Sequence, residues 1–217
     1  MCNIQTMATQ SSTSSRAEKA RATREHLIAT AIDVVRQRTY GAATMFEVAK
    51  AAGVTPGALQ HHFGSRAMLM LAILQSILES TEEDGIPWPD ATMPLPERAA
   101  AYLDALWTRL YEPPRFLTAW SVYFGAADES ALQPRIAEMR RELTDSVHVR
   151  FTQIFPEARA HADLPAVVDL ILSALRGMGV ARLFGTHPQA EVAQRAQLAT
   201  FIATWCRNAP PLHKETP

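Results

Sequence analysis

Two short helices joined by a tight turn are the strongest constraint that this sequence places on its fold. Residues 39–69 read TYGAATMFEVAKAAGVTPGALQHHFGSRAML. Thr44 and Glu47 fit a capping box, in which the Thr44 hydroxyl accepts from an unpaired backbone N–H and Glu47 reaches back to the Thr44 N–H. Gly53 can take the left-handed conformation that ends helices. The pattern therefore predicts a helix from Thr44 to about Ala52.

A second short helix is predicted directly after the turn. Thr55 is a favoured N-cap residue and Pro56 a favoured first helical residue, so this helix should run to about Phe63. A tight turn of this kind lets the second helix pack across the first and project into the major groove of DNA. Leu59 and Phe63 lie four residues apart and should form its buried face. The candidates for contact with DNA are Thr44, Met45, Phe46, Thr55, Pro56, Gly57, Ala58, Gln60, His61 and His62.

The residue types around this motif favour DNA contacts over metal binding. Gln60 can pair with an adenine edge, and Ala58 can touch a thymine methyl group. Arg66 follows the helix-capping Ser65 and is expected to contact a phosphate. His61 and His62 are adjacent, so their side chains point about 100° apart on a helix. They cannot chelate one ion, and no third ligand lies at a usual spacing, so no metal site is predicted.

The motif resembles the TetR family of one-component transcriptional regulators. The chain matches the family pattern at Tyr40, Thr44, Ala49, Ala52, Gly53, Val54, Gly57, Leu59, His62, Phe63, Ser65 and Leu69. It departs from the pattern at four positions, where the family usually carries Gly, a basic residue, Tyr and Lys. These positions are Thr39, Phe46, Gln60 and Arg66. The last exchange keeps a cation, whereas the exchanges at 46 and 60 affect which operator sequence is read.

Charge is divided unevenly along the 217 residues. Residues 1–70 contain eight Lys and Arg against four Asp and Glu, and the remaining residues contain thirteen against eighteen. A basic N-terminal part suits phosphate neutralisation and predicts salt-sensitive DNA binding. The chain is 47% hydrophobic, so it has enough apolar material for a further core beyond the DNA-reading helices.

Beyond residue 66 the chain is predicted to consist of helices punctuated by prolines. Six helices are expected, near 66–83, 96–111, 113–127, 133–155, 164–184 and 188–207. With three helices in the reader, the fold class is all-α with about nine helices, the number that the resemblance implies. The expected organisation is a disordered tail (1–19), a helix-turn-helix DNA-binding domain (20–65), a helical effector-binding and dimerisation domain (66–208) and a C-terminal tail (209–217).

The last two helices carry apolar stripes that are candidates for a dimer interface. These residues are Val168, Ile171, Leu172, Leu175, Met178 and Gly179 on the first, and Val192, Ala196, Ala199, Ile202 and Ala203 on the second. Two antiparallel helices meeting a two-fold copy give a four-helix bundle, the arrangement that similar proteins use. The alternative is that both stripes are only core of the monomer.

Aromatic residues concentrate in the middle of the chain, where an effector would bind. The candidate ligand-binding residues are Tyr102, Trp107, Phe116, Trp120, Tyr123, Phe124, His148, Phe151 and Arg176. Arg109, His148 and Arg176 could recognise an acidic group. An aromatic stripe at helical spacing is also typical of plain core. The resemblance implies a small, often apolar effector in this region, whose binding moves the two readers of a dimer out of register with the operator.

These observations favour a dimeric repressor that binds a palindromic operator and is released by a small, largely apolar effector. The alternatives are a transcriptional activator or an effector-independent DNA-binding protein. A helical enzyme is the least favoured alternative, because the sequence offers no nucleophile with a base, paired carboxylates, Gly-rich phosphate loop or metal-spaced ligands. No cofactor is predicted. We find no leader peptide and no apolar run of membrane-spanning length, so a cytoplasmic protein without a membrane partner is expected.

Overall fold

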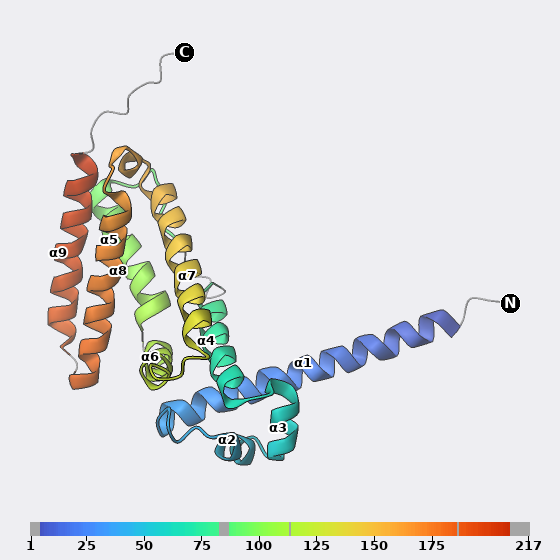
Figure 1. The fold of residues 1–217 in the computed structure, drawn as a ribbon. Helices are drawn as coiled ribbons and strands as arrows, with labels where there is room; N and C mark the ends of the chain where they lie inside the picture. The colour runs from blue at the N-terminus through green and yellow to red at the C-terminus, as the bar shows by residue number, and fades with distance from the viewer. Residues whose placement is uncertain (1–4, 83–86, 113, 186, 209–217) are drawn as a thin grey trace. The chain divides into compact units, whose positions relative to one another are not determined.

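The computed structural model describes residues 5–82, 87–112, 114–185 and 187–208, and in this part of the chain all regular structure is helical (Figure 1). The α-helices are α1 (Gln5–Gln37), α2 (Met45–Ala51), α3 (Pro56–Phe63), α4 (Arg66–Glu82), α5 (Leu95–Leu106), α6 (Arg115–Gly125), α7 (Gln133–Ile154), α8 (Leu164–Ala181) and α9 (Pro188–Arg207). A short π-helix, η1 (Trp107–Tyr111), prolongs α5, and two 3₁₀ turns, η2 (Pro156–Ala160) and η3 (Arg182–Phe184), flank α8. The prediction of an all-α fold with about nine helices is confirmed.

The chain divides into two compact units. Unit 1 comprises Met1–Ile77 and Thr118–Gln133, and unit 2 comprises Leu78–Leu117 and Pro134–Pro217. This division differs from the predicted boundary at residues 65/66, because the first part of α4 and the last part of α6 pack with α1–α3. The functional roles assigned to 20–65 and 66–208 remain predictions. The predicted C-terminal tail, 209–217, lies outside the described residues.

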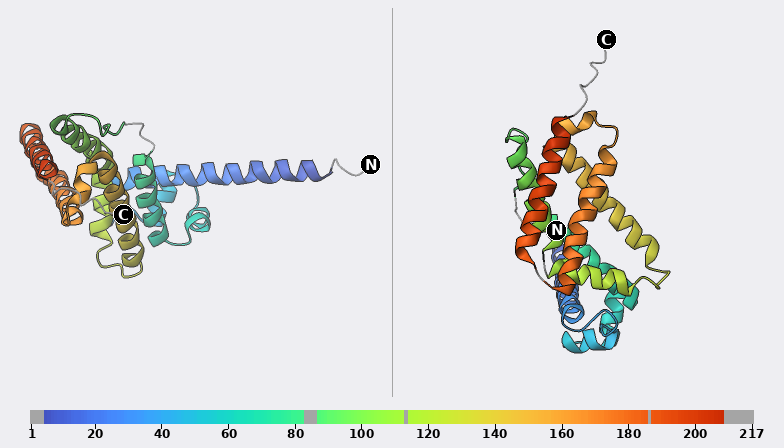
Figure 2. Two further views of the ribbon diagram at one scale, coloured as in Figure 1. Left: turned by 90° about the horizontal axis from the view of Figure 1, so that it is seen from above. Right: turned by 90° about the vertical axis from the view of Figure 1, so that its left-hand side faces the viewer.

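The first helix begins earlier than the sequence suggested. A disordered tail was expected over residues 1–19, whereas α1 begins at Gln5 (Figure 2). Extending an existing helix gains one hydrogen bond per residue, and Ala, Gln, Met, Lys and Arg in this stretch are compatible with a helix. The buried face described for α1 lies in its C-terminal half and consists of Leu27, Ile28, Ala31, Val34 and Val35.

Unit 1 has a core assembled from all of its helices. The apolar face of α1 contacts α2, and α2 contacts α3. The fully buried side chains of this core include Val48 and Leu59 from the two short helices, and Leu69, Met70 and Ile73 from α4. The end of α6 adds Val122 and Ala126. Because α2 packs on α1 and α3 packs on α2, this packing fixes the surface that the two short helices expose.

Unit 2 is organised around the packing of α5 on α9 (Figures 1 and 2). Its largest fully buried side chains are Tyr102, Phe151 and Phe155, whose rings lie 4.7–5.4 Å apart between centroids. The inner face of α8 adds Val168, Ile171, Leu172 and Leu175. Gly179 allows a close approach, since a Cβ there would lie 2.6 Å from Cε1 of Phe116.

One segment of unit 2 corrects the expectation that no apolar run reaches membrane-spanning length. By length and composition alone, Leu164–Phe184 is long enough and apolar enough to cross a membrane, with a mean hydropathy of 1.6. A single helix of this kind is weak evidence for a membrane span, because core helices pass the same test. The inner face of this helix is buried within unit 2. Its hydropathy therefore reflects core residues on one face and apolar residues on the other.

Candidate DNA-reading surface and helix-pairing face

Side-chain caps fix the start of both short helices. The Thr44 hydroxyl accepts from the Glu47 N–H at 3.2 Å, and the Thr55 hydroxyl accepts from the Ala58 N–H at 3.1 Å. Gly53, with φ of 68°, lies between the helices in the left-handed region that favours glycine. These features agree with the predicted caps and turn. Together they set the angle between α2 and α3.

The reciprocal half of the predicted capping box is replaced by other contacts. The Thr44 N–H donates to the carbonyl of Ala42 at 2.9 Å. The Glu47 carboxylate instead pairs with the guanidinium of Arg38, which follows α1. A cation within reach competes well for a carboxylate, because charge-assisted hydrogen bonds are stronger than neutral ones. Glu47 therefore ties α2 to the end of α1.

The third helix exposes the residues that were predicted to face DNA. Leu59 is fully buried and Phe63 is 6% exposed, as predicted. On the other side, the exposed residues of the α2–α3 surface are Thr44, Phe46, Thr55, Pro56, Gly57, Ala58, Gln60 and His61, whereas Met45 and His62 are half-buried. Phe46 is 61% exposed although it is apolar. The residues are thus available for contact, and their DNA-binding role stays a prediction.

Arg66 is half-buried and is bound by residues of unit 1, and its predicted contact with a phosphate stays a prediction. Its Nε donates to the carbonyl of Ala43 at 3.1 Å, and its Nη2 donates to the carbonyl of Tyr40 at 2.6 Å. Its Nη1 binds the carboxylate of Glu129 at 2.9 Å, and the guanidinium lies 4.1 Å from the centroid of the Tyr40 ring. All three kinds of guanidinium nitrogen are therefore engaged within unit 1. Sequence reasoning could not see this, because Glu129 lies 63 residues away.

The adjacent histidines contact each other edge-on. The ring centroids of His61 and His62 lie 5.9 Å apart in an edge-on arrangement. The described residues contain no group of three or more His, Cys, Asp or Glu side chains that could hold a metal ion. The second histidine packs beside Phe63, with 6.3 Å between ring centroids.

Most of the predicted dimer residues are buried within the single chain. The buried ones are Val168, Ile171, Leu172, Leu175, Gly179, Ala199, Ile202 and Ala203, whereas Met178, Val192 and Ala196 are accessible. The stripes thus form the core of unit 2, which was the alternative interpretation. Hydrophobic periodicity identifies an apolar face, but it does not say whether the partner belongs to the same chain.

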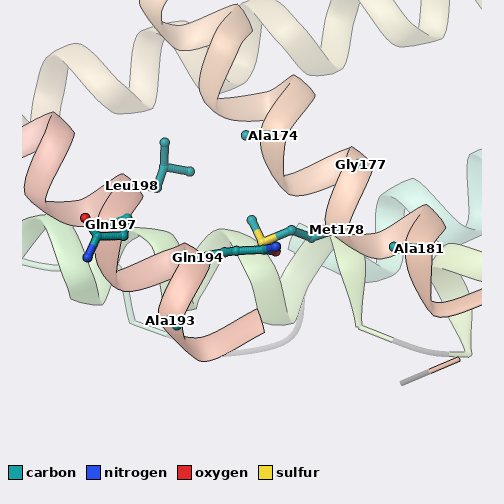
Figure 3. Close-up of a pocket in the computed structure, with 8 residues that line it drawn as sticks. All are labelled: Ala174, Gly177, Met178, Ala181, Ala193, Gln194, Gln197 and Leu198. Carbon is teal, nitrogen blue, oxygen red and sulfur yellow. The ribbon is translucent and has the colours of Figure 1, made fainter. Parts of the chain in front are cut away.

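The opposite faces of the same two helices form an open apolar groove (Figure 3). Its volume is about 670 Å³. It is lined by Ala174, Gly177, Met178 and Ala181 from α8 and by Ala193, Gln194, Gln197 and Leu198 from α9. Leu170 and Phe201 lie at helical spacing from these residues and are 54% and 38% exposed. We name these ten residues the α8–α9 outer face. It is lined mainly by small and apolar residues, with no charged side chain among the ten.

The predicted effector-binding aromatics fall into separate groups. Trp120, Tyr123 and Phe124 pack on one another in unit 1, with centroid distances of 4.9 and 5.6 Å from Trp120. In unit 2, Tyr102 packs edge-on against Phe151. Also in unit 2, Trp107 and Phe116 each contact the ring of an intervening tyrosine.

That intervening residue is Tyr111, which sequence reasoning missed. Its hydroxyl donates to the carbonyl of Leu172 at 3.1 Å. Burial raises the pKa of Tyr111 to about 12, and the positive charge of Arg176 opposes this shift. His148 lies 3.2 Å from Asp169. His148 and Arg176 thus both belong to unit 2, and their role in ligand binding stays a prediction.

Comparison with known proteins finds a family match in the N-terminal part of the chain. The model of bacterial regulatory proteins, tetR family, matches residues 27–73, which include the last third of α1, the whole of α2 and α3, and the start of α4. This part of the chain therefore carries the N-terminal motif of the TetR family. This match confirms the resemblance drawn from the helix-turn-helix residues.

The relatives are also regulators. Over 107 residues, which make up 49% of this chain, it is 29% identical to the HTH-type transcriptional regulator BetI of Rhizobium meliloti. The match spans about half (53%) of that relative's length. A crystal structure of a transcriptional regulator from Rhodococcus sp. Rha1 has a TM-score of 0.68, with 19% identity over 83% of this chain and 96% of that chain. The multidrug binding protein EbrR, solved with imidazole, has a TM-score of 0.62 and 23% identity, and the match covers 82% of this chain and 89% of EbrR.

These likenesses carry different amounts of information. At identities below 25%, the solved structures show the shared helical fold. The match to the curated relative is concentrated on about half of that protein, so operator, effector and assembly do not transfer with it. In this chain they have to be argued from the residues of the α2–α3 surface and of unit 2.

Arg98 is a further structural residue of unit 2 that the sequence did not reveal. It is 3% exposed, and its Nη1 donates to the carbonyls of Ala91 and Ile154 at 2.5 and 3.0 Å. Its Nη2 binds Glu157 at 2.7 Å. Arg98 therefore ties the segment before α5 to the end of α7 and to η2. Nothing local in the sequence distinguishes it from an exposed arginine.

Proposed function

We propose that this TetR-family regulator is a homodimeric repressor that binds a palindromic operator through α3 and releases it when a small effector binds. The observation that carries the proposal is the division of α3 into two faces. Leu59 and Phe63 anchor the helix in the core, while Thr55, Gly57 and Ala58 at its N-terminal end are exposed and small. Small residues at that end allow the helix to lie deep in a major groove.

Base recognition in this proposal depends on a few side chains. Gln60 is exposed and can make two hydrogen bonds to adenine, and Ala58 can contact a thymine methyl group. Phe46, exposed at the start of α2, offers a second apolar contact to base edges or sugars. The exposed Thr44 and Thr55 hydroxyls cap their helices and can also lie beside phosphates.

The homodimer is proposed to form through the α8–α9 outer face. Met178 is the predicted interface residue that lies directly in the groove, and Gly177 leaves open space where a second helix could approach closely. Adding two such helices from a second copy gives a four-helix bundle. A two-fold axis then relates two reading helices, which is what a palindromic operator requires. This choice replaces the buried stripes by the exposed sides of the same helices.

The effector is proposed to be small and largely apolar, bound within unit 2 near Trp107, Tyr111 and Phe116. The Trp107 ring stacks on the Tyr111 ring with 6.0 Å between centroids, and the Phe116 ring lies tilted against Tyr111 at 5.3 Å. Tyr102, Phe151, His148 and Arg176 remain candidates for the same unit. EbrR, a protein of the same fold, has been solved with the small molecules imidazole and ethidium. An effector releases DNA if it binds the non-binding conformation more tightly, and a few kcal/mol suffice. We place this regulator in the cytoplasm, together with its DNA.

Selection of random duplex DNA by the purified protein tests this proposal. The protein is expected to recover a two-fold symmetric sequence, bound far more tightly than a scrambled duplex of equal length, with an affinity that falls steeply as salt rises. Small apolar compounds can then be screened for release of the labelled duplex. Recovery of an asymmetric sequence bound by one protomer would contradict the dimer, and equal binding to both duplexes would contradict an operator reader. The position of the site relative to a promoter separates repression from activation.

A further inference from the structure

An ionic cluster in unit 1 joins the turn before α2 to the connection between α6 and α7. Arg66, at the first residue of α4, binds Glu129 at 2.9 Å. The Tyr40 hydroxyl donates to the same carboxylate oxygen of Glu129, and the Tyr40 ring lies under the Arg66 guanidinium. The side chains of Arg66 and Glu129 are 27% and 35% exposed, and Tyr40 is 9% exposed. Three side chains from distant parts of the sequence therefore act as one group.

The cluster grips the backbone immediately before the DNA-reading helices. The Arg66 guanidinium donates to the backbone carbonyls of Tyr40 and Ala43 at the same time, so its orientation is fixed. Ala43 is fully buried, and the next residue, Thr44, is the N-cap of α2. The position of α2, and of α3 packed against it, is thus set by hydrogen bonds from the start of α4.

Hydrogen bonds within the α6–α7 connection hold the backbone of Glu129 in place. In the α6–α7 connection, the N–H of Glu129 donates to Ala126 at 3.0 Å and its carbonyl accepts from Leu132 at 2.9 Å. The Gln133 amide donates to the carbonyls of Ala126 and Ala127 at 2.9 and 3.0 Å. This short, internally bonded segment holds the carboxylate in place. Its geometry is therefore suited to orienting Arg66.

A glycine at the end of α6 allows the tyrosine of the cluster to approach. A Cβ on Gly125 would lie 2.1 Å from Cγ and Cδ1 of the Tyr40 ring, which is too close for any side chain. The ring therefore packs directly on the backbone at the end of α6. Burial raises the pKa of Tyr40 above its usual value, so the hydroxyl stays protonated and remains a donor to Glu129 at neutral pH.

We propose that Arg66, Tyr40 and Glu129 form a clamp that positions α2 and α3 for DNA, and that Arg66 is a positioning residue rather than a phosphate contact. The proposal rests on the DNA-binding function argued above. It assigns a role in DNA binding to Glu129, an acidic residue outside the helix-turn-helix. Long-range electrostatics alone predicts the opposite effect on DNA affinity. Removing the negative charge of Glu129 from a DNA-binding unit should strengthen its attraction to phosphates.

The proposal is tested by whether removing the Glu129 charge weakens or strengthens operator binding. Glu129→Gln keeps the shape of the side chain and removes its charge. Asp128→Asn makes the same change at the neighbouring exposed position, whose side chain forms no ion pair within the described residues. With the full-length protein and its selected operator, Glu129→Gln is expected to weaken binding about tenfold, the effect of losing one charged hydrogen bond. Asp128→Asn is expected to leave affinity unchanged or to raise it slightly. Equal affinities for the two variants, or tighter binding by Glu129→Gln, would overturn the clamp.

Arg66 variants separate positioning from phosphate contact. Arg66→Lys keeps the charge but cannot make the planar set of hydrogen bonds to two carbonyls and a carboxylate. The clamp predicts that Arg66→Lys binds as poorly as Arg66→Ala and that both keep the wild-type salt dependence. Arg66→Ala combined with Glu129→Gln should be no weaker than Arg66→Ala alone. A phosphate contact predicts instead that Arg66→Lys retains affinity and that Arg66→Ala lowers the salt slope by about one.

A measurement without DNA keeps this inference separate from the proposed function. Amide hydrogen exchange in residues 43–51 should be faster in Glu129→Gln and in Gly125→Ala than in the wild type and in Asp128→Asn, with the α5 and α9 amides unchanged. If the wild type recovers no operator, the proposed function fails while the exchange result still decides whether the clamp exists. Unchanged exchange in α2 for both variants would overturn it.

Discussion

The α2–α3 surface and the α8–α9 outer face differ in how they are specified. The first is defined by local signals: two threonine caps, a glycine with positive φ and a proline at the first turn of α3. The second consists of the residues of α8 and α9 that remain exposed once the core of unit 2 is formed, and no local sequence signal marks it. A reader surface can thus be recognised from thirty residues of sequence, whereas a pairing face becomes visible once the core residues are known.

Burial separates two leucines that are chemically equivalent in these regions. Leu59 in α3 is fully buried, so Leu59→Ala is expected to lower the free energy of unfolding by about 2–5 kcal/mol and to abolish operator binding. Leu170 in α8 is 54% exposed, so Leu170→Ala should change the free energy of unfolding by about 0.5 kcal/mol or less. Chemical denaturation at a fixed protein concentration measures both. A large loss for Leu170→Ala at a concentration where the protein is monomeric would contradict the exposed assignment.

A charge placed in the α8–α9 outer face is expected to separate the protomers. Met178→Glu should give a folded monomer by analytical ultracentrifugation, with helical content retained. Operator affinity should fall about 100-fold, because the second reader no longer acts at high effective concentration. Val149→Glu on α7 is the control, since Val149 is 57% exposed and lies outside the groove. If both variants remain dimeric, the pairing face lies elsewhere.

Single-residue changes in α3 should alter sequence preference without altering assembly. Gln60→Ala is expected to lose about 1–3 kcal/mol of discrimination at one base position in each half-site. Its binding to non-specific DNA should be unchanged, because no charge is removed. Selection of operator libraries with the variant gives the result directly. A uniform loss on every sequence would mean that Gln60 supports the fold or touches the backbone.

Two glycines of α8 offer the finest comparison between core and pairing face. Gly177 has open space at its Cβ position, so Gly177→Ala should raise the stability of the monomer by about 0.5–1 kcal/mol through helix propensity. The same change should weaken the dimer if a second helix approaches closely. Gly179→Ala should instead lower stability, because its Cβ would lie 2.6 Å from the Phe116 ring. Thermal unfolding over a dilution series separates the two contributions.

The sequence predicted the fold to within a few residues beyond residue 44. Prolines, caps and glycines are local signals, and they placed α2 to α9 correctly. The start of α1 was not predicted, because polar residues with good helix propensity resemble a tail in composition. The apolar stripes of α8 and α9 were found, but periodicity does not distinguish a core from an interface.

The candidate sites were less predictable where they depend on distant residues. The exposed face of α3 follows from its period and caps. The engagement of Arg66 by Glu129 does not, because no local signal joins positions 63 residues apart. The candidate ligand-binding aromatics do not form one group, since Trp120 belongs to unit 1 and Trp107 to unit 2. Tyr111 was missed because the π-helix at the end of α5 shifts the helical register there.

The most direct test of the account is the stoichiometry of the complex with the selected operator. Titrations followed by analytical ultracentrifugation should compare the full symmetric duplex with a duplex carrying one half-site. We predict two protomers on the full duplex and binding to the half-site that is weaker by about 100-fold or more. One protomer per duplex, with equal affinity for the full site and the half-site, would contradict a paired reader.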